Sequence, residues 1–444
     1  MVRHSFSEGG RPALRVAHLT RALRHRNYQL FFGGQLISLT GTWMQQIAQS
    51  WLVYRLTRSS ALLGFVSFAG QIPVFLLASI GGAVADRLNR HRIIICTQTI
   101  SMGLAFVLAA LTLAGVVRVW HVFVLAAILG VVNAFDIPAR QAFLVDMVGR
   151  DDLMNAIALN SSMVNGARVV GPAIAGGLVA VVGEGWCFLL NGISYIAVIV
   201  GLLLMRLPHH RRLALSGRSA IADIIEGFRF SGQTAPIRAL LVLLGIVSLT
   251  AMPYAVLMPV FADAILHGGA AGLGLLMGAS GVGALAGALS LAARRDIRGL
   301  GRWVATSTLM FGVTLLLFAL SRTFWLSAVL LVPIGASMMV EMAASNTLIQ
   351  AMVPDALRGR VMAVYSMMFM GMAPFGALLA GWMAGRVGAP AAVAAGGLVC
   401  VVSSVVFALK LPALRIEARR LIVAQGLAAG TPPQEMTVPV RAQS

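Results

Sequence analysis

Long apolar stretches separated by short polar segments make up most of this chain. A helix needs roughly 20 apolar residues to cross a bilayer, and twelve stretches reach about that length. They lie at 29–54, 61–85, 93–116, 119–142, 157–182, 185–206, 236–262, 271–293, 303–320, 323–347, 361–385 and 388–410. The runs are continuous, whereas the strands of a membrane barrel alternate. The pattern therefore predicts an all-α membrane protein with twelve transmembrane helices.

The charged residues indicate how these helices are oriented. Only 11% of the 444 residues are charged, whereas a soluble domain carries roughly 25%. The net charge of +19 would suit nucleic acid or a membrane surface. With the N-terminus in the cytoplasm, 28 of the 34 Lys and Arg residues belong to that side and five to the other. This asymmetry predicts cytoplasmic termini and disfavours nucleic-acid binding.

The chain matches itself when it is shifted by 205 residues. Trp120 meets Trp325, and Asp136 meets Glu341. Five glycines also coincide with glycines, namely Gly166, Gly171, Gly176, Gly183 and Gly192 with Gly371, Gly376, Gly381, Gly388 and Gly397. The chain therefore consists of two copies of a six-span unit in the same orientation. Parallel repeats of this kind are typical of secondary transporters, whose substrate site lies between the halves.

The repeat divides the chain into five parts. We expect a basic cytoplasmic tail at 1–28, a six-helix bundle at 29–206, a cytoplasmic linker at 207–235, a second six-helix bundle at 236–410 and a cytoplasmic tail at 411–444. In the linker, apolar residues follow helical spacing at Ile221, Ile224, Ile225 and Phe228. They predict an amphipathic helix that lies on the cytoplasmic membrane face or packs as a linker helix.

A charged loop follows the second span, in the stretch "GGAVADRLNRHR" from Gly81 to Arg92. Gly82 is expected to permit close helix approach, and Asp86 to end the span as an acceptor. The arginines Arg87, Arg90 and Arg92 are expected to hold the loop at the cytoplasmic interface. The stretch resembles the signature loop of the major facilitator superfamily. That family has Gly where Asn89 stands, and Asn best tolerates the left-handed backbone among other residues.

Two further stretches resemble a branch of that superfamily. "NAFDIPARQAF" ends the fourth span, and "NGARVVGPAIAGGL" lies in the fifth and is similar to the Gly-Pro motif of drug-exporting antiporters. It has three residues, not two, between its Gly-Pro and Gly-Gly pairs. With "VGRDDLMNAIALN" between them, residues 20–412 resemble the enterobactin-type siderophore exporters, also called transmembrane secretion effectors. The resemblance implies the major facilitator fold and a latch between Asp86 and Arg140 that closes the cytoplasmic gate.

The Gly-Pro stretch also has a physical meaning of its own. Pro172 has no N–H and so removes the helical hydrogen bond to the carbonyl of Arg168. Ala167, Gly171 and Ala175 recur at i+4, which lets a neighbouring helix come close. We expect a hinge or gate here, formed by Arg168, Gly171, Pro172 and Gly176. Tight packing around a simple kink is the alternative.

Few ionisable residues fall inside the predicted spans. The four that we single out are Asp136, Arg140, Arg168 and Glu341. A charge in the bilayer interior costs at least about 2.5–3.5 kcal/mol, so each residue is a functional candidate. Asp136 and Glu341 are candidates for proton coupling, with Asp136 preferred because Arg140 and Arg168 are available as partners. A static ion pair between Asp136 and either arginine is the alternative.

Polar residues in the first two spans are candidates for lining the substrate cavity. They are Gln45, Gln46, Gln49 and Gln71, together with Arg168 of the fifth span. Hydrogen bonding between neighbouring helices would explain the glutamines equally well.

These features favour a proton-driven exporter of small amphipathic molecules, drug or siderophore-like, in the cytoplasmic membrane of a bacterium. A metabolite importer or lysolipid flippase on the same fold is the alternative, and a non-transporting membrane sensor is a third. An enzyme is disfavoured because no nucleotide loop, metal cluster or nucleophile triad is evident. The expected partners are a small-molecule substrate, protons and membrane lipid, and we expect no cofactor and no metal. The protein is expected to be a monomer.

Overall fold

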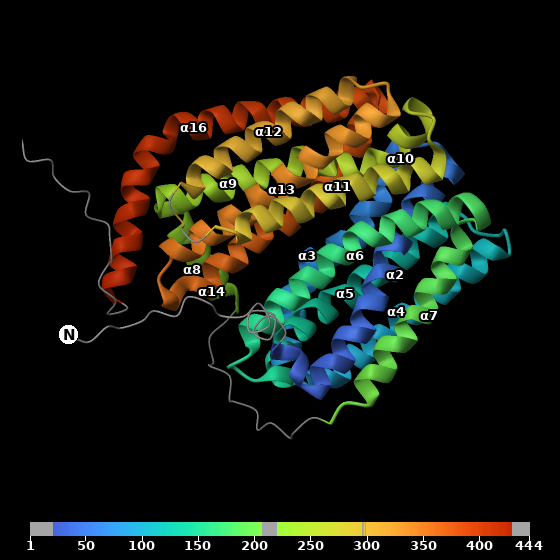
Figure 1. The fold of residues 1–444 in the computed structure, drawn as a ribbon, viewed down its shortest axis with the longest axis horizontal. Helices are drawn as coiled ribbons and strands as arrows, with labels where there is room; N and C mark the ends of the chain where they lie inside the picture. The colour runs from blue at the N-terminus through green and yellow to red at the C-terminus, as the bar shows by residue number, and fades with distance from the viewer. Residues whose placement is uncertain (1–20, 207–219, 295–296, 298, 429–444) are drawn as a thin grey trace, which may run out of the picture.

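The computed structural model describes residues 21–206, 220–294, 297 and 299–428 (Figure 1). All regular secondary structure in these residues is helical, and no strand occurs among them. The prediction of an all-helical chain from continuous apolar runs is therefore confirmed.

The N-terminal group of helices begins with the short 3₁₀ turn η1. It consists of η1 (Arg21–Arg24), α2 (Arg26–Thr57), α3 (Ser60–Arg87), α4 (Arg90–Leu113), α5 (Val119–Val148), α6 (Leu153–Val182) and α7 (Glu184–Leu203). Within this group α3 packs on α5, α4 packs on α5 and α7, and α2 packs on α6 and α7.

The C-terminal group follows the connecting helix α8 (Ala220–Gln233) and is less regular. It consists of α9 (Ala235–Thr250), η2 (Met252–Leu257), α10 (Met258–Val260), η3 (Phe261–Ile265), α11 (Gly269–Ala292), α12 (Leu300–Leu320), α13 (Phe324–Met352), α14 (Asp355–Ser366), η4 (Met367–Gly371), α15 (Ala373–Val387) and α16 (Ala389–Ala428). Two spans predicted as single helices are thus interrupted, by a 3₁₀ turn at 252–257 and by π-helical turns at 261–265 and 367–371.

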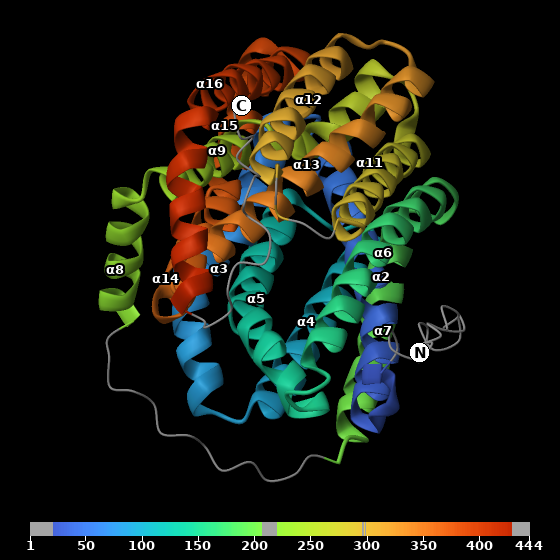
Figure 2. The same ribbon diagram turned by 60° about the vertical axis from the view of Figure 1, so that its left-hand side comes forward.

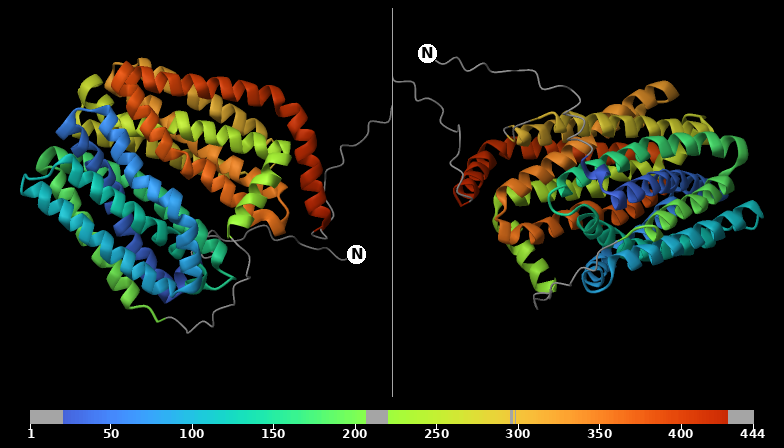
Figure 3. Two further views of the ribbon diagram at one scale, coloured as in Figure 1. Left: turned by 180° about the vertical axis from the view of Figure 1, so that it is seen from behind. Right: turned by 60° about the horizontal axis from the view of Figure 1, so that its bottom comes forward.

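The two groups meet mainly through two helix pairs, α6 with α11 and α3 with α15. Figure 2 shows the groups as separate stacks joined along these helices. We call the end where α3 meets α4 and α5 meets α6 the arginine-rich end, after Arg87, Arg90 and Arg150. The opposite end is where α2 meets α3 and α6 meets α7. The view from behind shows the same two stacks (Figure 3).

In the part of the chain that the structure describes, eleven helices are long and apolar enough to cross a membrane. The first predicted span, at 29–54, is a helix, but α2 is not one of the eleven. Its 32 residues would reach across a bilayer, yet Gln35, Gln45, Gln46 and Gln49 lower its hydropathy. The twelve-span layout therefore depends on α2 and stays a prediction.

Corresponding turns of the two groups agree with the 205-residue repeat. Gly183 ends α6 with φ 89°, and its counterpart Gly388 ends α15 with φ 87°. Only glycine adopts such a backbone without strain. Gly192 of α7 packs on Phe106 of α4, and its counterpart Gly397 of α16 packs on Gly312 of α12.

The last helix corrects the predicted C-terminal boundary. We expected the last span to end at 410 and a cytoplasmic tail to follow, but α16 continues to Ala428. Pro412 lies inside the helix, and Figure 1 shows α16 bending before it descends past α14. Proline bends a helix without necessarily ending it. Beyond the bend, Leu414, Ala418, Leu421 and Ile422 share one face and pack against buried residues of the C-terminal group.

The N-terminal boundary also differs from the prediction. Residues 21–28 were assigned to a basic tail, but they dock on the start of α6. The backbone N–H of Ala22 donates to Asn155 Oδ1 at 2.8 Å, and the Tyr28 hydroxyl donates to the carbonyl of Ala156 at 2.9 Å. Tyr28 is fully buried, so this segment belongs to the folded core. Residues 1–20 and 429–444 lie outside the described residues.

The linker helix is present at 220–233 and packs on α14. A Cβ on Gly227 would lie 2.7 Å from the carbonyl oxygen of Arg360, and Glu226 pairs with Arg360 at 2.7 Å. Ile225 and Phe228 remain exposed. The packed-linker alternative thus accounts for one side of the helix. The rest of the predicted linker at 207–219, and the side chain of Ile221, lie outside the described residues.

Candidate functional site

At the opposite end, the two groups are joined by glycine contacts. A Cβ on Gly176 of α6 would lie 2.8 Å from the Cα of Gly274 on α11. A Cβ on Gly381 of α15 would lie 2.9 Å from the Cα of Gly64 on α3. Gly381 is the repeat counterpart of Gly176, so the two halves contribute equivalent glycines. Both helix pairs approach so closely that a side chain on either glycine would displace the neighbouring backbone.

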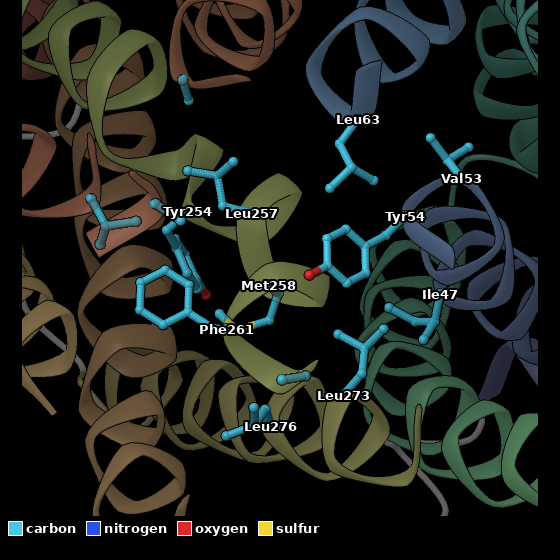
Figure 4. Close-up of a cluster of buried hydrophobic side chains, with 14 of the residues drawn as sticks. Ile47, Val53, Tyr54, Leu63, Tyr254, Leu257, Met258, Phe261, Leu273 and Leu276 are labelled. Carbon is cyan, nitrogen blue, oxygen red and sulfur yellow. The ribbon is translucent and has the colours of Figure 1, made fainter. Parts of the chain in front are cut away.

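An apolar cluster lies beside these crossings and spans both groups (Figure 4). We call it the cross-group cluster; it includes Ile47, Val53, Tyr54 and Leu63 of the N-terminal group and Leu257, Met258, Leu273 and Leu276 of the C-terminal group. In Figure 4 the Tyr54 ring points across toward Met258. At its edge, Arg58 forms an ion pair with Asp263. The opposite end is therefore closed by packing and by charge.

A cavity of about 420 Å³ lies between the two groups. Ligand pockets typically measure about 300–1,000 Å³, so a small molecule fits. Val53 and Leu63 line the cavity and also belong to the cross-group cluster, so this cluster closes it toward the opposite end.

The polar groups of the cavity come almost entirely from the N-terminal group. They are Thr42, Gln45, Gln46, Gln49, Ser50, Ser67, Gln71, Asn133, Asn191 and Tyr195. The C-terminal group lines its side with Ser248, Met252, Pro253, Ala255, Val256, Met277, Ala373 and Ala377. The cavity therefore has one polar wall and one largely apolar wall.

All four glutamines predicted for the cavity line it. Gln45 also accepts a hydrogen bond from Asn191 Nδ2 at 2.7 Å, and Gln71 Nε2 donates to Ser67 Oγ at 2.8 Å. The alternative of bonding between neighbouring helices is thus correct for Gln45, on α2, which bonds to α7, whereas the bond of Gln71 stays within α3. Sequence reasoning missed Asn133, Asn191 and Tyr195, although Asn191 and Tyr195 are four residues apart on α7 and therefore share one face of that helix.

Arg168 does not line this cavity. Its guanidinium lies over the ring of Trp43 on α2, 5.5 Å from the ring centroid. An arginine on an aromatic face is a favourable cation–π arrangement. The residue predicted as a cavity group therefore lies where α2 and α6 meet.

The Gly-Pro stretch packs as its spacing predicts. Ala167 and Ala175 are buried, and a Cβ on Gly171 would lie 2.6 Å from the Cβ of Trp43 and 2.9 Å from the carbonyl oxygen of Thr40. Pro172 is buried in α6, which runs without a break from Leu153 to Val182. Close approach of α2 to α6 is thus confirmed, while a hinge motion stays a prediction.

Asp136 is buried and fully engaged. Its carboxylate accepts from Thr97 Oγ1 at 2.6 Å and from Gln98 Nε2 at 3.0 Å, and it pairs with Arg140 one turn away. The predicted alternative of a static pair with Arg140 describes this arrangement. No bond between Asp136 and Arg168 occurs among the described residues.

Glu341, the repeat counterpart of Asp136, has the opposite environment. It is 0% exposed, and neither carboxyl oxygen has a hydrogen-bond partner among the described residues. The Oγ atom of Ser345, one turn away, is likewise buried without a partner. An ionised carboxylate is expensive to bury without partners, so this site favours a neutral carboxyl.

The charged loop lies at the arginine-rich end, within the N-terminal group. Asp86 Oδ1 accepts from Arg90 at 3.4 Å, and Arg90 also pairs with Asp146 at 3.2 Å. Arg140 pairs with Asp136 instead. The latch between Asp86 and Arg140 is therefore not made in this conformation. Arg87 and Arg92 are exposed.

Two expectations about this loop were wrong in detail. A Cβ on Gly82 would meet nothing within 4 Å; Gly81 makes the close approach instead, to the backbone of Ala134. Asn89 has φ −72° rather than a left-handed backbone, and its side chain caps α4 by accepting from the Arg92 N–H at 3.3 Å. Asparagine is among the best helix N-caps. This role explains why asparagine stands at position 89, where the family has glycine.

A second polar cluster at the arginine-rich end escaped sequence reasoning. Asp152 accepts from His25 Nε2 at 2.9 Å and pairs with Arg21 at 3.2 Å. The hydrogen bond from His25 and the positive charges of Arg21 and Arg24 hold the pKa of Asp152 below its ordinary value. The only signal available was an acid at the start of α6, where a helix dipole favours negative charge.

No group of three His, Cys, Asp or Glu residues that could hold a metal ion occurs in the described part of the chain.

Comparisons with known proteins agree on the kind of protein. Residues 19–433 match the family described as transmembrane secretion effectors. The enterobactin exporter EntS of Shigella boydii is 26% identical over 403 residues, which cover 90% of this chain and 95% of EntS. The multidrug efflux pump Tap of Mycolicibacterium fortuitum is 28% identical over 386 residues, covering 83% and 91%. The staphyloferrin A transporter of Staphylococcus aureus is 26% identical over 357 residues, covering 79% and 87%.

Solved structures agree on the fold. A peptide transporter of the POT type in complex with sulfate superposes with a TM-score of 0.71 at 13% identity, covering 88% of this chain and 95% of that one. A bacterial homologue of the human lysosomal transporter Spinster, in an inward-facing and unoccupied conformation, has a TM-score of 0.61 at 15% identity, covering 93% and 98%. At these identities the likeness concerns the fold alone.

Proposed function

Because the chain belongs to the transmembrane secretion effector family of major facilitator transporters, we propose that it exports small amphipathic molecules by alternating access, driven by protons. The observation that carries this proposal is the cavity between the two groups, closed at one end by glycine crossings and the cross-group cluster. Such a cavity suits a molecule with a polar edge and an apolar face.

In this proposal the arginine-rich end faces the cytoplasm of a bacterium, as the distribution of arginine favours. The described conformation is then the inward-facing state, which takes up substrate from the cytoplasm. Rocking of one group against the other would separate Gly176 from Gly274 and release the substrate outside. Asp86 would latch the cytoplasmic side in that second state.

The names of the relatives support export over import. EntS is named as an enterobactin exporter and Tap as a multidrug efflux pump. We extend to this chain only what those names share, the outward movement of a small molecule.

Proton coupling requires a group that gains and loses a proton during the cycle. Glu341 is the favoured carrier, because its buried carboxyl has no cation or hydrogen-bond donor among the described residues to hold it ionised. In the second state, contact with water would allow it to release the proton. Asp136, preferred from the sequence, is the second candidate, since Arg140, Thr97 and Gln98 hold its carboxylate in place.

Inverted membrane vesicles from cells that overproduce the protein test this proposal. An acidic interior should drive the accumulation of labelled amphipathic compounds, and nigericin should abolish it by collapsing the pH gradient. Glu341→Gln should lose the gradient-driven part. Accumulation only in right-side-out vesicles would indicate an importer, and no flux of any compound would favour a sensor.

The orientation is tested separately. Reporter fusions at Gly183 and Gly268, two turns at the opposite end, should report an external location. A cytoplasmic location at either position would contradict the proposed orientation.

A further inference from the structure

The two walls of the cavity differ in chemistry and belong to different groups of helices. Amide and hydroxyl side chains from α2, α3, α5 and α7 form one wall. The facing wall, from α9, η2, α11 and α15, offers Ser248 as its single hydroxyl, and that hydroxyl already donates to the carbonyl of Phe369. Hydrogen-bonding capacity for a ligand therefore comes from the N-terminal group.

Among the described residues that line the cavity, none is Asp, Glu, Lys, Arg or His. Two charged residues predicted from the sequence are engaged elsewhere: Asp136 pairs with Arg140, and Arg168 lies over Trp43. A charged ligand that leaves water for this cavity would thus find no counter-ion there. Burying an unpaired charge costs far more free energy than burying a hydrogen-bonded polar group.

Several groups of the polar wall are available to a ligand. Gln45 and Asn191 bond to one another and are buried, so they form the rigid back of this wall. Gln46 is exposed, and Gln49, Gln71 and Asn133 are partly exposed, with only Gln71 Nε2 committed to Ser67. Each amide offers both a donor and an acceptor, and together they line one side of a cavity of about 420 Å³.

The facing wall suits adaptation to different shapes. Met252 and Met277 lie on it, partly exposed, among alanines and a proline. Methionine is flexible and fits irregular apolar surfaces.

We infer that the cavity recognises neutral amphipathic molecules that carry amide or hydroxyl groups along one edge, held by Gln46, Gln49, Gln71 and Asn133, with the apolar face against the C-terminal group. This inference rests on the proposed function and specifies its substrate class. The polar edge stays with the N-terminal group while the apolar wall moves past it during the transport cycle. Specificity therefore lies in one half of the repeat, and tolerance of different apolar shapes lies in the other.

Equilibrium binding to the purified full chain in lipid nanodiscs tests this inference without requiring transport. Three dansyl probes share one apolar body and differ in the attached group: dansyl-glucosamine is neutral, dansyl-glycine is an anion and a dansyl-choline ester is a cation. The neutral probe should bind at least about tenfold more tightly than either ion, a difference of about 1.4 kcal/mol. Tighter binding of the anion or the cation, or no binding of the neutral probe, would overturn the inference.

Variants locate the recognition. Gln49→Leu and Gln71→Leu should each weaken binding of the neutral probe by about tenfold, since each removes a hydrogen bond and leaves a ligand group unpaired. They should leave binding of the charged probes unchanged. Gln350→Leu, in α13 and outside the cavity, is the matched control and should bind like the parent chain. Unaltered affinity for the neutral probe in both cavity variants would contradict the inference. If the parent chain binds the neutral probe selectively but shows no proton-driven flux, only the proposed function is contradicted.

Discussion

Arg58 and Asp263 form an ion pair with one another although they occupy equivalent positions in the two halves of the chain. The two residues are 205 positions apart, which is the shift that superposes the repeat. In a two-fold arrangement, a residue meets its own counterpart only near the axis. The pair therefore marks the pseudo-two-fold axis at the opposite end, beside the cross-group cluster. Opening of this end must break it.

Reversing one charge of this pair should favour opening of the opposite end. Arg58→Glu places two acids together, and Asp263→Arg places two arginines together. Because Arg58 is exposed and water screens the pair, the equilibrium between the two states should shift only modestly. Spin labels at Val181 and Leu320, both exposed, measure the separation of the groups.

The double reversal, Arg58→Glu with Asp263→Arg, is the control and should restore the parent distance distribution. If the single reversals leave that distribution unchanged, the pair does not stabilise the closed end.

A larger effect is expected from the glycine crossing. Gly176→Leu inserts a side chain where the Cα of Gly274 lies 2.8 Å from an ideal Cβ. Overpacking costs about 1–3 kcal/mol, which should move the population strongly toward the open end. Gly177→Leu is the matched control, because a Cβ there meets nothing within 4 Å. Equal distance distributions for the two variants would show that the crossing does not close the gate.

Much of this architecture was predictable because lipid imposes strict rules on a sequence. Continuous apolar runs located the helices, and the four glutamines stood out as cavity candidates because polar side chains in a span need a partner or water. The repeat also contained an unused signal, since the same shift places Arg58 opposite Asp263. What it lacked was any indication that these positions lie on the axis, which only the packing of the two groups defines.

Other features were not predictable, because they depend on small differences in packing. Gly81 rather than Gly82 approaches α5, a choice decided by the rotation of α3 about its axis. The roles of Asp136 and Glu341 also differ although the repeat makes them equivalent. Asp136 finds donors on α4, whereas none reaches Glu341 among the described residues. The continuation of α16 beyond Pro412 required its contacts with the C-terminal group.

The signature loop yields a prediction that separates stability from transport. In the described conformation Asp86 is exposed and makes one long contact, with Arg90 at 3.4 Å. Asp86→Asn should therefore change the melting temperature little, because such contacts contribute at most about 1 kcal/mol. It should slow transport severalfold if the residue latches the other conformation. Asp355→Asn, an exposed acid paired with Arg358 at 2.6 Å, is the control and should transport normally. Wild-type transport by Asp86→Asn would contradict the latch.

Docking of the N-terminal segment should depend on pH. The pKa of Asp152 is lowered chiefly by the hydrogen bond from His25, then by the charges of Arg21 and Arg24. A lowered pKa in the folded state means that the stabilisation is complete above the ordinary value of about 3.9 and is lost as the pH falls through the lowered value. The protection factor of the backbone amide of Ala22, its exchange rate corrected for the intrinsic effect of pH, should fall in that acid range. In the Asp152→Asn variant the Ala22 amide should exchange quickly at neutral pH too. The control is Asp151→Asn, which alters an exposed neighbouring acid and should leave that exchange slow. Slow exchange in Asp152→Asn would contradict this role.

The two span acids should respond differently to neutralisation. Glu341→Gln removes a proton site without removing a bond, since neither carboxyl oxygen has a partner among the described residues. The variant should fold with an unchanged melting temperature and still exchange substrate downhill. It should fail to accumulate substrate against a gradient, because an amide cannot change its charge with pH. Substrate-induced proton release in reconstituted vesicles measures this directly.

Asp136→Asn should instead fail through stability. It leaves the half-buried Arg140 without its counter-charge and disturbs the bonds that Thr97 and Gln98 donate to the acid; breaking a fully buried pair costs about 3–5 kcal/mol, and partial exposure of Arg140 reduces that cost. Removing both charges, in Asp136→Asn with Arg140→Leu, should recover most of that loss and retain proton-driven accumulation. That recovery would identify the Asp136 pair as structural and leave Glu341 as the carrier. If Glu341→Gln accumulates substrate at the parent level while the recovered double variant does not, the assignment is reversed, and the proton travels through the paired acid.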